Sequence, residues 1–415
     1  MRALRANERL LMICGSTVLV MAGQGVVAPV LPLFARDFGV STAAIGLTLA
    51  MFGLARLVLN VPMGYVADRY GRRLLLVGGP ILSAVGMIGS GWAPDFWVLL
   101  AWRFVAGAGS AAYMTGAQIY LIDISVPANR ARYVAVNQGA LLIGVSLGPG
   151  LGGLVAEVAG LRAPFFVVGA SAGFAALYSW FRLPETRGSI GAETAGPRDT
   201  PVATNPVGRG RQAWRFAMSR DFVAVGLVTM AIFTVRTGHQ ATLMPLLATE
   251  RFDMGPAGIG VIFVLAGVMG LVLIGPAAWI ADAYGRKQAI VPTGLIAAVG
   301  MVVVAVSPTV GWLVAGSMVL AVGSGVTGPA PAAYVADIAP VELRGVAMGM
   351  YRTSGDLGFL IAPPLLGWLA DATSIGTAMV VNAVLVAAAS LWFLVAAAEP
   401  ARAGAGAAAV RSAGS

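Results

Sequence analysis

The sequence is poor in charged residues, and this scarcity limits the class of protein. Only 11% of its 415 residues are Asp, Glu, Lys or Arg, whereas 58% are hydrophobic. A soluble globular domain carries about 25% charged residues. The composition therefore excludes an ordinary soluble domain and indicates an integral membrane protein.

Cysteine and histidine are also nearly absent. Cys14 and His239 are the only residues of their types, so no disulfide forms within the chain, and no Cys/His cluster suggests a metal site. The chain lacks a His-Glu-x-x-His pair and a phosphate-binding loop, and it has no long segment outside the apolar stretches to house such chemistry. We expect neither an enzymatic activity nor a cofactor or metal ion.

Apolar stretches of about 20 residues, the length that crosses a bilayer as a helix, make up most of the chain. Twelve can be drawn, near residues 10–33, 43–67, 74–93, 97–121, 134–156, 164–182, 222–247, 257–281, 289–307, 311–335, 345–369 and 376–397. They predict an all-α integral membrane protein with about twelve transmembrane helices. The first stretch is too long for a signal-peptide core and is interpreted as a retained span.

Positive charges predict the orientation. With the N-terminus inside, most of the 27 Lys and Arg lie in cytoplasmic segments, and only Arg36, Arg162 and Arg251 lie in outer loops. This bias follows the positive-inside rule and predicts a multi-pass protein of the cytoplasmic membrane with both termini inside. It also accounts for the net charge of +9, so we expect the lipid bilayer as partner and no nucleic acid.

The sequence repeats itself at an offset of 214 residues, which takes Asp68 to Asp282. The segment 64–73 aligns with 278–287, and the same offset pairs Tyr120 with Tyr334, Asp123 with Asp337, Arg130 with Arg344, Pro149 with Pro363 and Gly153 with Gly367. Two copies of one membrane unit are typical of alternating-access carriers. We expect two pseudo-symmetric six-helix bundles at 1–183 and 221–398, a cytoplasmic linker at 184–220 with a short amphipathic stretch near Trp214, and a disordered tail at 399–415.

The repeated loop resembles the loop between the second and third helices of the major facilitator superfamily, and the resemblance extends from Leu10 to about Val395. Gly71 permits a tight turn, and Gly64 lets a neighbouring helix approach. The resemblance implies a charge relay that latches the outward-facing state, formed by Asp68, Arg72 and Asp123 and, in the second copy, by Asp282, Arg286 and Asp337. Gly285 is the second copy of the turn glycine in this latch. The alternative is a loop of solvated charges.

The fifth span is similar to the antiporter motif of this family, a GxxxGPxxGG run. The matching residues are Gly144, Gly148, Pro149, Gly152 and Gly153. Small residues spaced by four form a groove for close helix packing. The second copy has Ala362 where the first has Gly148, and in the family this asymmetry accompanies proton-coupled exporters. Ordinary glycine-rich packing is the alternative.

Ionisable residues within the spans are candidates for function because burying them in a bilayer is costly. They are Arg56, Arg103, Arg236, His239, Arg352 and Asp356. Asp356 is the only carboxylate near the midplane, and Arg352 lies one helical turn away. We hypothesise that Asp356 carries the coupled proton and Arg352 modulates it. A structural pair within one helix is the alternative.

Two further candidates for proton coupling are Arg103 and His239. Arg103 precedes Gly107 and Gly109 in a stretch that resembles the family's RxxxGxG type, where the arginine is expected to assist proton transfer. His239 titrates near neutral pH in its unperturbed form. Purely structural roles remain the alternatives for both. The residues predicted to line a substrate cavity are Gln24, Arg56, Ser110, Met114, Asn137, Gln138, Arg236 and Gln240.

The sequence therefore predicts a monomeric, proton-coupled exporter of small organic molecules. The first helix has no acidic residue within it, so the arginine-rich interior favours neutral or anionic amphipathic solutes over cationic drugs. An uptake symporter or facilitator, and a membrane receptor that transports nothing, are the alternatives.

Overall fold

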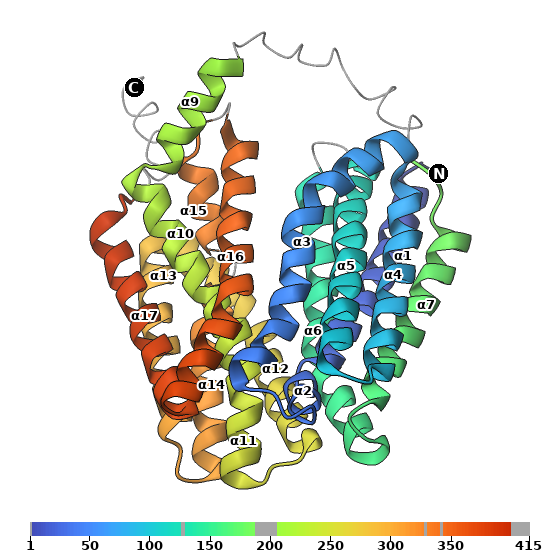
Figure 1. Cartoon of the computed structure of the whole chain (residues 1–415). Coiled ribbons are helices and arrows are strands. Elements are labelled where there is room, and N and C mark those ends of the chain that lie inside the picture. Colours follow the sequence, from blue (N-terminus) through green and yellow to red (C-terminus); the bar gives the residue numbers. More distant parts are fainter. Residues whose placement is uncertain (1, 126–128, 187–205, 328–329, 341–342, 400–415) are drawn as a thin grey trace. The chain divides into compact units, whose positions relative to one another are not determined.

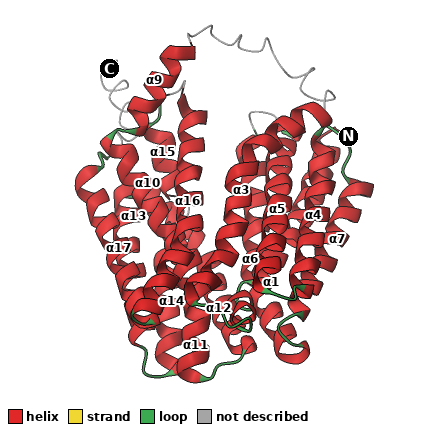
Figure 2. Ribbon diagram, in the orientation of Figure 1, coloured by secondary structure: helices red, strands yellow, loops and turns green. Residues whose placement is uncertain are grey.

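The structure is a computed structural model that describes residues 2–125, 129–186, 206–327, 330–340 and 343–399, and within them every regular element is a helix (Figures 1 and 2). The helices of the first sequence half are α1 (Arg2–Val27), α2 (Leu31–Arg36), α3 (Thr42–Tyr70), α4 (Arg72–Trp92), α5 (Phe96–Ile124), α6 (Arg130–Ala159) and α7 (Ala163–Arg182). Later helices are α9 (Pro206–Ala217), α10 (Arg220–Phe233), the π-helix η1 (Thr234–Leu243), α11 (Met244–Phe252), α12 (Pro256–Ala283), α13 (Arg286–Val306), α14 (Val310–Thr327), α15 (Ala330–Ile338), α16 (Arg344–Ala372) and α17 (Ile375–Ala396).

Ten stretches in the described part of the chain are long and apolar enough to cross a membrane. Two of them combine successive helices, Arg220–Phe252 and Val310–Ile338. Helices α5 and α16, with 29 residues each, are not among these ten, and they contain the ionisable residues Arg103 and Asp356. The count of twelve spans stays a prediction. The predicted all-α membrane fold is confirmed.

The chain forms two compact units, and neither is one half of the sequence. The first comprises Met1–Ala203, Arg236–Val268 and Phe359–Met379, and the second comprises Thr204–Val235, Met269–Gly358 and Val380–Ser415. Parts of the seventh, eighth and eleventh spans therefore pack with the first six. The bundle boundaries at 183 and 221 stay a prediction. Helix α9 lies where the amphipathic stretch near Trp214 was expected, while residues 187–205 of the linker and 400–415 of the tail lie outside the described residues.

The core of the first unit combines large apolar residues with a few paired polar ones. Helix α1 packs along α6 and α7, and α5 packs against α3 and α4. Tyr113 is fully buried, and its hydroxyl lies 2.9 Å from the Thr17 hydroxyl, which donates to Asn137 Oδ1 at 2.8 Å. Because these buried polar groups satisfy one another, they fix the register of α1 against α5 and α6.

The second unit has an aromatic core of its own. Tyr334 of α15 and Phe393 of α17 are fully buried, with ring centroids 5.0 Å apart. Large apolar side chains on the outside are common in both units, among them Trp180, Leu151, Val272 and Trp392. Apolar surface of this extent is expected where helices face lipid.

Candidate functional site

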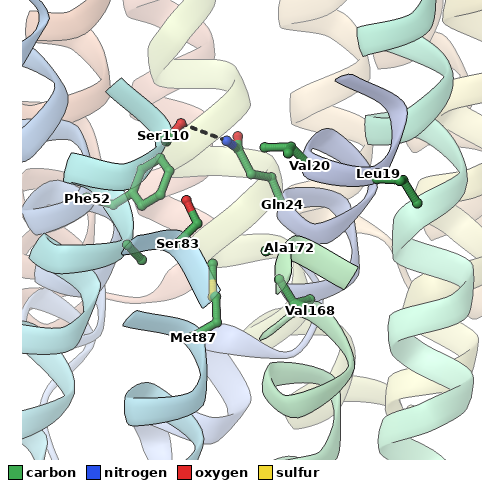
Figure 3. A pocket seen from close by; sticks show the side chains of 10 residues that line it. Leu19, Val20, Gln24, Phe52, Ser83, Met87, Ser110, Val168 and Ala172 are labelled. Atoms are coloured by element: carbon green, nitrogen blue, oxygen red, sulfur yellow. Dashed lines mark hydrogen bonds between the residues drawn. The ribbon is translucent and has the colours of Figure 1, made fainter. Parts of the chain in front are cut away.

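A small pocket lies within the first unit, between α1, α3, α4, α5 and α7 (Figure 3). Its cavity volume is only about 10 Å³, and its lining includes Gln24, Phe52, Ser83, Met87, Ser110 and Val168. Gln24 Nε2 donates a hydrogen bond to Ser110 Oγ at 2.9 Å. The structure thus brings together two residues that the sequence predicted to face a cavity. A cavity of this size has room for about one water molecule, and its walls are apolar with a few hydrogen-bonding groups.

Arg103 lies directly behind this pocket and is only 4% exposed. Its Nε donates to the Thr48 carbonyl at 3.3 Å, its Nη1 lies 3.7 Å from Met87 Sδ, and its Cζ lies 4.9 Å from the centroid of the Phe52 ring. Phe52 and Met87, which line the pocket, therefore separate the guanidinium from it. Within the described residues no carboxylate forms an ion pair with Arg103. The carbonyl bond fits the structural alternative for this arginine.

Glycines of α5 create this arrangement. A Cβ at Gly107 would overlap the backbone of Phe52, and one at Gly109 would overlap the backbone of Ser83. Only glycine allows α5 to approach α3 and α4 this closely, and the approach places Phe52 over Arg103.

The other cavity candidates of the first half do not converge on this pocket. Asn137 belongs to the buried network with Thr17, Gln138 is exposed, and Met114 packs against the apolar core of the unit. Arg56 Cζ lies 5.9 Å from the centroid of the Phe359 ring of α16. These positions give Asn137 and Met114 structural contacts in this state.

The seventh span contains a π-helix, Thr234–Leu243, between α10 and α11. Thr242 Oγ1 donates to the Thr237 carbonyl five residues earlier at 2.7 Å. Short π-segments occur frequently at functional sites. His239 lies in the middle of this one and is 0% exposed, and neither of its ring nitrogens has a hydrogen-bond partner in the described part of the chain. Arg236 is exposed and Gln240 is half-buried.

Arg352 and Asp356 lie on one face of α16, as their spacing of four predicts. Arg352 is exposed and Asp356 is half-buried. Both belong to the second compact unit, whereas Arg236 and His239 belong to the first. Proton coupling by any of these groups stays a prediction.

The loop between α3 and α4 forms the expected pair of Arg72 with the end of α5. Arg72 Nε lies 2.8 Å from Asp123 Oδ2, and these side chains are 16% and 20% exposed. Gly71 has φ of 100°, which only glycine adopts readily. Asp68 is 73% exposed and 3.5 Å from Arg72 Nη2. A Cβ at Gly64 would meet no described atom within 4 Å, so the close helix approach expected there is not made in this structure.

The second copy repeats this geometry. Arg286 Nε lies 3.1 Å from Asp337 Oδ2, and Gly285 has φ of 109°. The side chain of Asp282 lies outside the described residues. The structure therefore contains two Arg–Asp pairs related by the sequence repeat.

Two glutamates of this region were not predicted from the sequence. Glu185 accepts hydrogen bonds from the backbone N–H groups of Arg72 and Arg73, both at 3.0 Å. Glu399 accepts from Arg286 and Lys287 at 2.8 and 3.4 Å. Each carboxylate caps the N-terminus of the helix that follows the loop. Because they are also 214 residues apart, the repeat itself was the signal that points to them.

The glycines of α6 use two faces of the helix. A Cβ at Gly144, Gly148 or Gly152 would overlap the backbone of α1 near Ala22 and Val26. Gly153, on the other face, meets Pro256 at the start of α12. The predicted groove of small residues is present, and it holds α1 close to α6.

Comparison with known proteins agrees with this arrangement. The sequence model of the Major Facilitator Superfamily matches residues 13–255 and 227–413. The tetracycline resistance protein of class C from Escherichia coli is 27% identical over 94% of this chain and 92% of its own. The quinolone resistance protein NorA of Staphylococcus aureus is 25% identical over 88% and 90%.

Solved structures share the fold. A bacterial homologue of the human lysosomal transporter Spinster, in an inward-facing and occupied conformation, superposes with a TM-score of 0.77 at 16% identity, over 93% of this chain and 96% of its own. The human organic anion transporter MFSD10 gives 0.66 at 19% identity, over 94% and 99%. With the family match spanning nearly the whole sequence, the chain belongs to the Major Facilitator Superfamily.

Proposed function

We propose that the protein is a proton-coupled secondary transporter that exports small organic molecules, drug-like compounds or metabolites, across the cytoplasmic membrane by alternating access. It acts as a monomer with both termini in the cytoplasm. Support comes from its relatives, which include tetracycline and quinolone resistance proteins, and from its own two-fold repeated Arg–Asp pairs.

The observation that carries the direction of transport is the glycine groove of α6. Gly144, Gly148 and Gly152 pack on α1, and Gly153 packs on α12. Helix α6 therefore contacts one helix of each sequence half through glycines, which place no side chain between the backbones. The second copy in α16 lacks the full set. This asymmetry is the pattern of exporters in the family that the chain belongs to.

Coupling to protons is assigned to Asp356, with Arg352 on the same helix face, and to His239 and Arg103 as further proton-coupling residues. Water and a nearby cation stabilise the charged form of a carboxyl group within the bilayer. Asp356 therefore ionises when the transport path brings water to its carboxyl group. The basic groups Arg56, Arg103 and Arg236 favour neutral or anionic amphipathic substrates.

Everted membrane vesicles with an acidified interior test the proposal. Addition of a transported compound releases stored protons if the protein is an antiporter, as a pH-sensitive dye reports. Asp356→Asn abolishes this release, whereas Asp95→Asn, at an outer loop where Asp95 caps its own helix, preserves it. Full proton release by Asp356→Asn rejects that residue as the coupling acid.

The same vesicles separate the alternative functions. An uptake symporter moves protons together with its solute, and a facilitator moves solute without protons. A receptor binds ligand without flux. If a diverse panel of neutral and anionic compounds shows only cotransport with protons, or only flux without protons, export by proton exchange is rejected.

A further inference from the structure

The outer ends of four spans meet within the first compact unit, in pairs that join the two sequence halves. Helix α16 ends against the start of α3, and α6 ends against the start of α12. Asp371, in the last turn of α16, accepts hydrogen bonds from the backbone N–H groups of Thr42 and Ala43, one on each carboxylate oxygen, both at 2.8 Å. Glu157, in the last turn of α6, accepts one from Ala257 at 3.3 Å.

These two contacts obey the same 214-residue offset as the cytoplasmic loops. The offset takes Glu157 to Asp371 and Ala43 to Ala257. It also relates the contacts one helical turn below, where a Cβ at Gly153 would overlap Pro256 and one at Gly367 would overlap Thr42. The repeat therefore preserves a carboxylate four residues beyond a glycine on the contact face of each helix.

One helical turn farther from the outer ends, the offset again relates two close backbone contacts. A Cβ at Gly260 would overlap the carbonyl of Pro149, and one at Gly46 would overlap the carbonyl of Pro363. The offset relates both pairs. Close backbone packing thus brings each carboxylate to the exposed N–H groups of the facing helix, where no backbone acceptor is available within the helix and the helix dipole favours a negative charge.

The cytoplasmic carboxylates Glu185 and Glu399 behave differently. Each caps a helix of its own sequence half, so neither contact breaks when the halves move apart. Glu157 and Asp371 cap helices of the opposite half. Their hydrogen bonds must break whenever the outer ends of α3 and α16, or of α6 and α12, separate.

We propose that Glu157 and Asp371 are positioning residues of the transport cycle, a two-fold pair of carboxylate caps that holds the outer ends of the helices together and releases them when the protein opens outward. Asp371 contributes more than Glu157, since it holds two N–H groups at shorter distances. The two caps control whether the outer side of the protein is open. This role does not depend on which solute is transported or on which residue carries the proton.

Distance measurement between spin labels tests this without substrate or proton gradient, so its outcome is independent of the proposed export function. Labels are placed on the purified full-length protein at Asp37→Cys and Ser374→Cys, two exposed outer positions, in a Cys14→Ser background. Asp371→Ala raises the ratio of long to short distances by about 3- to 30-fold, the range expected for loss of a helix cap. Asp371→Glu retains most of the short population.

The matched control is Asp95→Ala, which removes an outer carboxylate cap that lies within a single half, on Val98 of α5. It leaves the distance distribution unchanged. A second label pair at Ala159→Cys and Asp253→Cys, both exposed, reports Glu157→Ala, with a smaller shift than Asp371→Ala gives at its own pair. If the double variant Glu157→Ala/Asp371→Ala matches Asp95→Ala while remaining folded by thermal unfolding, the proposal is wrong.

Discussion

Arg72 and Asp123 form an ion pair between the loop that follows α3 and the end of α5, with 2.8 Å between Nε and Oδ2. Both side chains are at least four-fifths buried, and Thr186 Oγ1 donates to the same carboxylate oxygen at 2.9 Å. The arginine also reaches the Ala67 carbonyl at 3.1 Å. It therefore ties the end of α3 to the end of α5.

Replacement of the two acidic partners of Arg72 should have unequal effects. Asp123→Asn removes a partly buried charge-assisted hydrogen bond and lowers the free energy of unfolding by about 1–3 kcal/mol. Asp68→Asn removes an exposed partner and changes it by less than about 0.5 kcal/mol. Thermal unfolding in detergent measures both. Equal losses for the two variants would show that Asp68 is a closer partner of Arg72 than the 3.5 Å distance indicates.

The glycine groove of α6 yields a second comparison within one helix. Gly152→Ala places a methyl group against the carbonyl of Val26 and forces α1 away, which costs about 1–3 kcal/mol and reduces transport. Gly139→Ala meets open space and, because alanine favours helix more than glycine does, is neutral or slightly stabilising. The two variants are compared by thermal unfolding and by efflux rate. A stable, fully active Gly152→Ala protein contradicts the close contact.

Much of this arrangement could be predicted from the sequence, because many positions that match between the two copies are ones where the structure requires a particular residue type. Residue type and spacing predict the turn at Gly71 and the groove at Gly148, and the resemblance to the family implies the Arg72–Asp123 pair. Glu157, Asp371, Glu185 and Glu399 obey the same offset, but their caps depend on which helix end each carboxylate faces, and spacing alone does not reveal that.

Other features had no signal in a single sequence. The π-helix around His239 depends on which carbonyls neighbouring side chains leave available, and residues 234–243 read as an ordinary span. The role of Asn137 depends on Thr17, 120 residues away, which spacing alone does not reveal. Nor does composition show that Arg236–Val268 and Phe359–Met379 pack with the first six helices.

His239 offers a variant in which stability and function should separate. A buried imidazole whose nitrogens have no partner loses the hydrogen bonds it makes with water in the unfolded chain, at a cost of about 1–3 kcal/mol. His239→Leu, of similar volume, removes this cost and leaves the unfolding midpoint unchanged or higher. If His239 takes part in coupling as proposed, the same variant loses proton release in everted vesicles. A clear drop in the midpoint would show that the ring has a stabilising partner.

The outer cap at Asp371 should be insensitive to pH over the range in which the protein works. Burial alone raises the pKa of this carboxyl group, but hydrogen bonds from Thr42, Ala43 and Ser41 outweigh it and lower the pKa below its ordinary value. Asp371 lies beyond the predicted span 345–369, at the outer end of α16. A carboxylate with a lowered pKa contributes its full stabilisation above its ordinary pKa of about 3.9 and loses it only as the pH falls through the lowered value.

Spin-label distances between positions 37 and 374 should therefore be the same at pH 8, 7, 6 and 5, and should lengthen only below about pH 4, the ordinary range of an aspartate. In Asp371→Asn the group that titrates is gone, so the cap contributes no change at any pH. A shift in the native side chain's distances between pH 8 and pH 5 that vanishes in Asp371→Asn would show that this carboxylate takes up a proton in the working range. Because we expect the Asp371 cap not to titrate between pH 5 and pH 8, any pH dependence of transport in that range must arise at other groups. Asp356 and His239 are the first to examine, by the same substitution tests.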